Sequence, residues 1–147
     1  MRLTLNKMAT TDAQRHKMIR RAVLQRPEAV VEVTIELWER LAAELVLIIG
    51  EGGFQSLYAR SIHLTCAPFP WIEQDSLSPQ VDSRFSGLKL CLEARTSAET
   101  IEASTHLLAT FIKILAELIG EPLTDSILRS AWGDDAMYLA AKEIKNE

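Results

Sequence analysis

Two arginines, Arg60 and Arg129, stand beside apolar residues in segments typical of helices, and they are the residues best suited to bind an anion. A guanidinium among apolar side chains must be paired or reach solvent. If the two converge with Tyr58 and Trp132, they form a small-molecule or anion pocket between two helical hairpins. If each bonds separately to a glutamate or to helix-end carbonyl groups, they are structural, which is the commoner arrangement.

A histidine in a long apolar segment, His106, is the candidate for phosphotransfer. The stretch 104–112 resembles the H-box of histidine-kinase dimerisation domains, in which the phosphorylated histidine lies on a long bundle helix. The resemblance implies a degenerate phosphoacceptor role for His106. The sequence departs from that family where the chemistry is concentrated, with Leu107, Ala109 and Phe111 in place of its acidic residue, basic residue and proline. Because a working site needs such activating groups, a histidine at the polar edge of a packed helix is the favoured interpretation.

Four soft ligands, His63, Cys66, Cys91 and His106, could in principle bind a metal, but their spacing matches no specific zinc pattern. Cys91 stands between leucines, where a small buried thiol is the ordinary explanation. We therefore predict no metal and no cofactor. The sequence also has no nucleophile-elbow, Walker, dinucleotide-binding or zinc-protease motif, which indicates that the protein is not an enzyme.

Four glutamates, Glu28, Glu32, Glu36 and Glu39, recur every three to four residues and share one face of a helix. Di-iron bundle proteins combine such glutamates with Glu-x-x-His pairs, and this sequence has none. The spacing therefore predicts a solvated acidic face, facing the basic first helix.

Charge is distributed unevenly along the 147 residues, whose net charge is −4. Residues 1–27 contain seven basic residues and one acidic residue, so the rest of the chain is strongly acidic. We expect the basic segment to dock on the chain's own body or on a partner subunit. We expect no nucleic-acid binding, because no aromatic residues are interleaved with the basic ones. With neither a signal peptide nor an apolar run long enough for a membrane span, we expect a cytoplasmic protein without membrane contact.

The elements that must position these residues are helices. Aliphatic residues dominate a hydrophobic share of 48%, and they recur at three- and four-residue steps. The sequence predicts one all-α domain: a loose basic arm over 1–10 and then a bundle of six to seven helices with two long central ones. The expected helices cover 11–25, 27–49, 54–64, 82–94, 96–119, 122–132 and 135–145.

Two Ile-Gly-Glu motifs, centred on Gly50 and Gly120, each end a long apolar helix. They indicate a pair of similar helical hairpins, by duplication or by convergence on one capping solution. The 27–49 helix is apolar nearly all round, which favours burial on more than one side and a symmetric homodimer. We therefore expect a non-catalytic regulatory or interaction module of bacterial signalling or transcriptional control, with another signalling protein as a conceivable partner.

Overall fold

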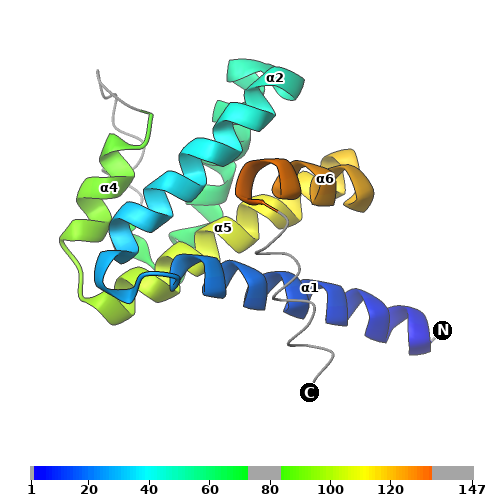
Figure 1. The fold of residues 1–147 in the computed structure, drawn as a ribbon, viewed down its shortest axis with the longest axis horizontal. Helices are drawn as coiled ribbons and strands as arrows, with labels where there is room; N and C mark the ends of the chain where they lie inside the picture. Colours follow the sequence, from blue (N-terminus) through cyan, green and yellow to red (C-terminus); the bar gives the residue numbers. More distant parts are fainter. Residues whose placement is uncertain (1, 73–83, 134–147) are drawn as a thin grey trace.

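The fold is taken from a computed structural model, which describes residues 2–72 and 84–133, with side chains from residue 13 onward. These residues contain helices and no strand, which confirms the predicted all-α class (Figure 1). The elements within them are α1 (Arg2–Val23), η1 (Pro27–Ala29), α2 (Val30–Thr65), η2 (Pro70–Ile72), α4 (Ser86–Glu93), α5 (Ser97–Ile119) and α6 (Glu121–Trp132). The helix expected over 135–145 lies outside the described residues, so the count of six to seven helices remains a prediction.

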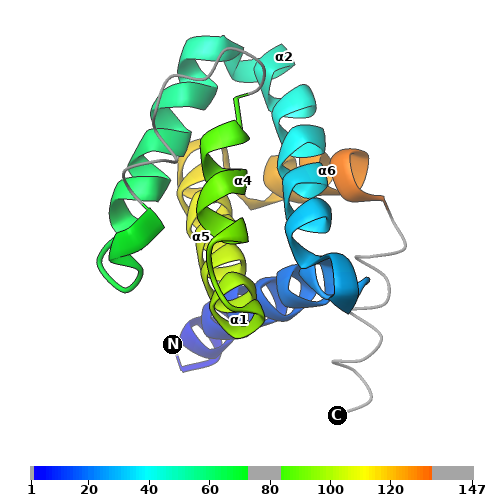
Figure 2. The ribbon, with the colours of Figure 1, turned by 90° about the vertical axis from the view of Figure 1, so that its left-hand side faces the viewer.

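α2 is a helical hairpin that reverses direction at Gly50 (Figure 2). Gly50 has φ 80° and ψ 166°, a backbone region that is essentially restricted to glycine. The helix resumes directly after it, whereas the sequence predicted a new helix only from Phe54. The difference arises because one residue in this conformation completes the reversal. Gly52 and Gly53 therefore stay in the helix.

The two arms of α2, 30–49 and 51–65, pack against each other through aromatic rings. Trp38 in the first arm meets Tyr58 in the second edge to face, with ring centroids 5.2 Å apart. Aromatic pairs of this geometry are worth about 0.5–1.5 kcal/mol beyond the area that they bury. The hairpin is therefore held by its own core as well as by its turn.

α5 is the helix against which α1, α2 and α6 all pack. It begins with the predicted capping box, in which Thr96 accepts a hydrogen bond from the Glu99 backbone while the Glu99 carboxylate accepts one from the Thr96 backbone, both at 3.2 Å. The middle of its apolar stripe forms the core, since the following side chains are fully buried: Leu107, Leu108, Phe111, Ile112 and Leu115. Leu118, which continues the same stripe, is 67% exposed. α5 is thus the helix that links α1, α2 and α6 in the described residues.

α1 begins at Arg2, not at Thr11 as predicted. The sequence placed a loose arm over 1–10 because residues 11–14 can form a capping box. Residues 2–10 contain neither proline nor glycine, so no helix breaker separates them from the helix that follows. The capping residues consequently lie in the interior of α1.

The basic first helix docks on the chain's own acidic body. Arg15 forms ion pairs with Glu121 and Asp125 of α6, and Arg20 pairs with Glu102 of α5 at 2.7 Å. The Arg15 side chain is only 8% exposed. Desolvation lowers the pKa of its guanidinium, but the hydrogen bonds to the two carboxylates more than offset this, so the pKa is raised. α1 is therefore fastened to both α5 and α6.

The two Ile-Gly-Glu motifs share one backbone conformation, since Gly120 has φ 93° and ψ 156° and so resembles Gly50. Gly133, which belongs to neither motif, has nearly the same angles, φ 92° and ψ 153°. A third occurrence outside the repeat shows that this is a general way for helices of this chain to end. The shared turn thus does not distinguish duplication from convergence.

Candidate functional site

The four residues predicted to line an anion pocket have different surroundings. Tyr58 and Trp132 are buried, with 2% and 8% of their surface exposed. Arg60 and Arg129 are exposed, and within the described residues neither forms an ion pair with a glutamate. Among the described residues, no hydrogen bond, ion pair or ring contact joins two of the four side chains. Among them, Trp132 alone lines the cavity described below.

Tyr58 belongs to the aromatic centre of the core. Its ring stacks on Phe54 and meets Trp38 and Phe85 edge to face, with ring centroids 5.2–6.0 Å apart. Burial, and to a lesser extent the nearby Cys91, raises the pKa of its phenol. Its hydroxyl has no hydrogen-bond partner among the described residues. The surroundings of Tyr58 are those of a core residue.

His106 is half-buried on α5, and its imidazole lies 5.7 Å from the ring of Phe69. Desolvation lowers the pKa of His106, and the like charge of His16 on α1 lowers it further. Glu102, one turn away on α5, forms an ion pair with Arg20. The described residues thus give His106 a second imidazole and an aromatic ring as neighbours, and no carboxylate that activates it. A phosphoacceptor role remains a prediction without structural support.

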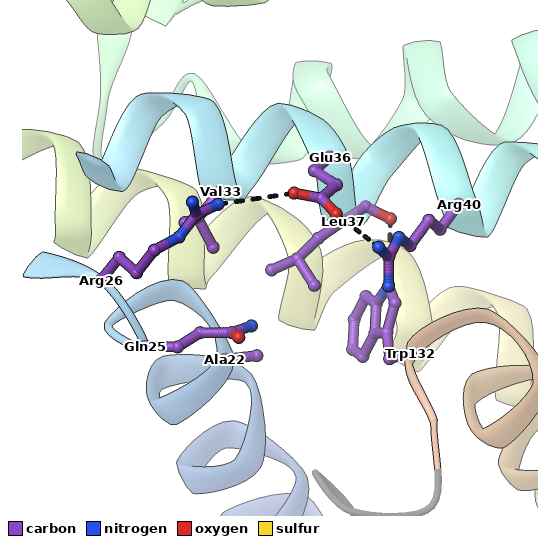
Figure 3. Close-up of a pocket in the computed structure, with 8 residues that line it drawn as sticks. All are labelled: Ala22, Gln25, Arg26, Val33, Glu36, Leu37, Arg40 and Trp132. Carbon is purple, nitrogen blue, oxygen red and sulfur yellow. Dashed lines mark hydrogen bonds and ion pairs between the residues drawn. The ribbon is translucent and has the colours of Figure 1, made fainter.

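A cavity of about 170 Å³ lies where the end of α1, the start of α2 and the end of α6 meet (Figure 3). Nearly buried aliphatic side chains and Gln25 line its inner end, and its rim carries two arginines with a glutamate between them. The lining residues are Ala22, Gln25, Arg26, Val33, Glu36, Leu37, Arg40 and Trp132.

The Trp132 indole forms one wall of this cavity and is held in place by a hydrogen bond. Its Nε1 donates to the backbone carbonyl of Leu37, 3.0 Å away and 95 residues distant in sequence (Figure 3). A buried indole N–H needs such a partner, since leaving it unpaired costs free energy. The bond therefore fixes the position of the ring against α2.

The rim of the cavity is a chain of three charges. Glu36 accepts a hydrogen bond from Arg40, one turn further along α2, and lies 3.6 Å from the guanidinium of Arg26 (Figure 3). All three side chains are about half exposed. Glu36 belongs to the predicted acidic face, whose four glutamates are indeed exposed. The sequence analysis missed both arginines, although Arg26 beside the helix-breaking Pro27 and Arg40 four residues after Glu36 were visible signals.

Large apolar side chains are exposed close in sequence to each of the two Ile-Gly-Glu turns. The described residues include six such exposed side chains: Leu47, Ile48, Leu64, Leu90, Leu118 and Leu123. Four of the six lie within three residues of Gly50 or Gly120. Leu47 is 84% exposed at the end of the first α2 arm and Leu118 is 67% exposed near the end of α5, so the described residues leave both side chains largely uncovered. We call Leu47, Ile48, Leu118 and Leu123 the turn patch.

The two cysteines lie in different parts of the fold. Cys66 lies near the end of α2 and its Sγ donates to the carbonyl of His63, while Cys91 is buried in α4. Within the described ranges, no group of three histidine, cysteine or acidic side chains is arranged to bind a metal ion. No helix in that part of the chain is both long enough and apolar enough to cross a membrane.

No protein family model, curated protein or solved structure gave a significant match to this chain. The functional conclusions therefore depend on the geometry of the described residues.

Proposed function

We propose that the protein is a non-catalytic helical interaction module that forms a homodimer through the turn patch. The observation that carries this proposal is the concentration of exposed aliphatic side chains beside two glycine turns. Isolated exposed leucines are ordinary on protein surfaces and need no explanation. Four at related positions of two helix ends are a better candidate for an association surface.

The energetics favour a symmetric arrangement. Covering a leucine or isoleucine that is otherwise exposed gains about 1.5–3 kcal/mol. In a twofold interface the same patch is used by both subunits, so each side chain contributes twice. Leu47 and Ile48 of two subunits together supply several kcal/mol, which is enough to offset part of the entropy lost on association.

A regulatory role in bacterial signalling or transcriptional control fits such a module, with a second signalling protein as a further partner. The catalytic alternative, phosphotransfer at His106, lacks an activating carboxylate among the described neighbours. A helix pair that ends in an exposed apolar tip can join either a second copy or a partner helix. We choose the second copy because both Ile-Gly-Glu turns of one chain carry exposed aliphatic side chains. Each subunit can therefore supply the apolar surface that covers the other.

The test is the oligomeric state in solution, measured by sedimentation equilibrium on the native chain and on two matched variants. Leu47→Glu buries a charge at the twofold interface in both subunits, so we expect the dimer Kd to rise by about 10²-fold or more. Leu90→Glu is the control, because Leu90 is also exposed but lies on α4 and is not part of the turn patch. A monomeric native protein, or equal weakening by both substitutions, contradicts the proposal.

A further inference from the structure

We propose that the cavity between α1, α2 and α6 binds a small carboxylic acid with a single aromatic ring, a ligand of the benzoate class. The cavity shares no lining residue with the turn patch, so this inference is independent of the proposed homodimer. It assigns a ligand class to a site that combines apolar surface with a pair of guanidinium groups.

The volume of the cavity suits one ring. An engineered apolar cavity of about 150 Å³ binds benzene, and this cavity has about 170 Å³. Ala22, Val33 and Leu37 supply an aliphatic floor, and each of them is at most 5% exposed. The Trp132 indole stands at its side, where a ligand ring can pack against it in an offset or edge-to-face arrangement.

The charges at the rim suit a carboxylate. Arg26, Glu36 and Arg40 together have a net charge of +1, and Glu36 is the only ion-pair partner of either arginine within the described residues. A guanidinium has five N–H donors, and each arginine directs a single nitrogen, Nη2, at Glu36. The remaining donors are available to a second carboxylate, and arginine pairs with carboxylates in a bidentate geometry.

The site is also pre-organised. The hydrogen bond from the Trp132 indole to the Leu37 carbonyl fixes the aromatic wall before any ligand arrives. Buried side chains fix the floor, so a ligand needs to order only the two half-exposed arginines. Pre-organisation of this kind raises affinity because less conformational freedom is lost on binding. A ligand of so few atoms is nevertheless expected to bind with a Kd on the order of 1 mM.

The experiment is an NMR titration that follows the indole N–H signals. The chain has three tryptophans, which give three indole cross-peaks in a ¹⁵N–¹H spectrum. Trp71→Phe and Trp132→Phe variants assign them. We expect benzoate to shift the Trp132 signal saturably, while the Trp38 signal, from the packed aromatic centre, stays in place. Acetate lacks the ring and benzyl alcohol lacks the charge, so each is expected to bind at least about tenfold more weakly.

Three substitutions at the rim and one elsewhere separate ligand binding from a merely structural ion-pair cluster. Arg26→Gln and Arg40→Gln each remove a charged donor and are expected to weaken benzoate binding at least about tenfold. Glu36→Gln removes the competing carboxylate and is expected to tighten it. Arg60→Gln is the control, because Arg60 is likewise exposed but does not line the cavity, and it is expected to leave the titration unchanged.

Three results overturn the inference. One is the absence of a saturable benzoate shift at the Trp132 signal. Another is equal binding of benzyl alcohol and benzoate, which would make the arginines irrelevant. The third is a Glu36→Gln variant that binds benzoate no more tightly than the native chain. An unchanged Trp38 signal in every variant shows that the fold is intact, so weaker binding is then a property of the rim.

Discussion

Gly50→Ala and Gly52→Ala, two residues apart in α2, are expected to change stability in opposite directions. Gly50 has φ 80°, where an alanine Cβ is strained even though no other atom lies within 4 Å of it. Gly52 lies in the helix that follows, and an added Cβ there also meets no atom within 4 Å. The two sites therefore differ in backbone conformation and not in the space available.

The magnitudes follow from that difference. A residue other than glycine in this backbone region costs about 1–3 kcal/mol. Alanine also lowers the conformational entropy of the unfolded chain, which raises the free energy of unfolding by about 0.4–1 kcal/mol. We therefore expect Gly50→Ala to lower the free energy of unfolding by about 1–2 kcal/mol. Gly52→Ala incurs no strain and is expected to raise it by about 0.5–1 kcal/mol, since alanine favours the helix.

Urea unfolding followed by circular dichroism measures both effects. All samples need the same protein concentration, because association stabilises the folded state by mass action. With an m-value of about 2 kcal/mol/M, the midpoints of the two variants should differ by about 1 M, with Gly52→Ala the higher. Equal midpoints, or a Gly50→Ala variant as stable as the native chain, would refute the assignment of strain to Gly50.

Two further predictions concern α1 and its neighbours. Arg15→Met removes both ion pairs to α6 but keeps an apolar side chain. Because the carboxylates left unpaired are 40–53% exposed, we expect the free energy of unfolding to fall by about 1–2 kcal/mol. Arg20→Met, at an exposed ion pair, is the control and should lower it by less than about 1 kcal/mol in the same urea assay. His106 has a pKa below its usual 6.5 when folded, so the unfolded chain binds its proton more readily, and stability is expected to fall as the pH is lowered through 6.5 towards the depressed pKa. His106→Asn should flatten this dependence, whereas an equal slope in the variant would contradict the link to His106 and its neighbour His16.

Local signals account for the parts of the fold that could be predicted. The capping box at Thr96 and the glycines after two apolar stripes mark helix ends in a way that needs no tertiary information. The errors also have local causes. Thr11 has the residues of a capping box, but nothing before it breaks the helix. At Gly50 a single residue interrupts the helix. Gly52 and Gly53, which were predicted to lie in the turn, belong to the helix that follows.

The candidate site was only partly predictable. Trp132 was identified from sequence, but Arg26 and Arg40 meet it only after three separate helices pack together. Arg60 illustrates a different limit. Its apolar neighbours are Tyr58 and Ile62, two positions away on either side, and residues two apart do not share a helix face. Adjacency in sequence therefore suggested a pocket shared with Tyr58, whereas the helix turns Arg60 to solvent.

The long-range links of α1 and α6 have a consequence for the order of folding. Trp38 and Tyr58, which close the α2 hairpin, are 20 residues apart in sequence, whereas Arg15 and Glu121 are separated by 106. Closing the larger loop costs about 1.5 kcal/mol more chain entropy, so we expect this closure only after the intervening helices have collapsed. The ligand cavity lies between the same helices. It is therefore among the last features to form. A molecule bound there would stabilise the packing of helices that are far apart in the sequence.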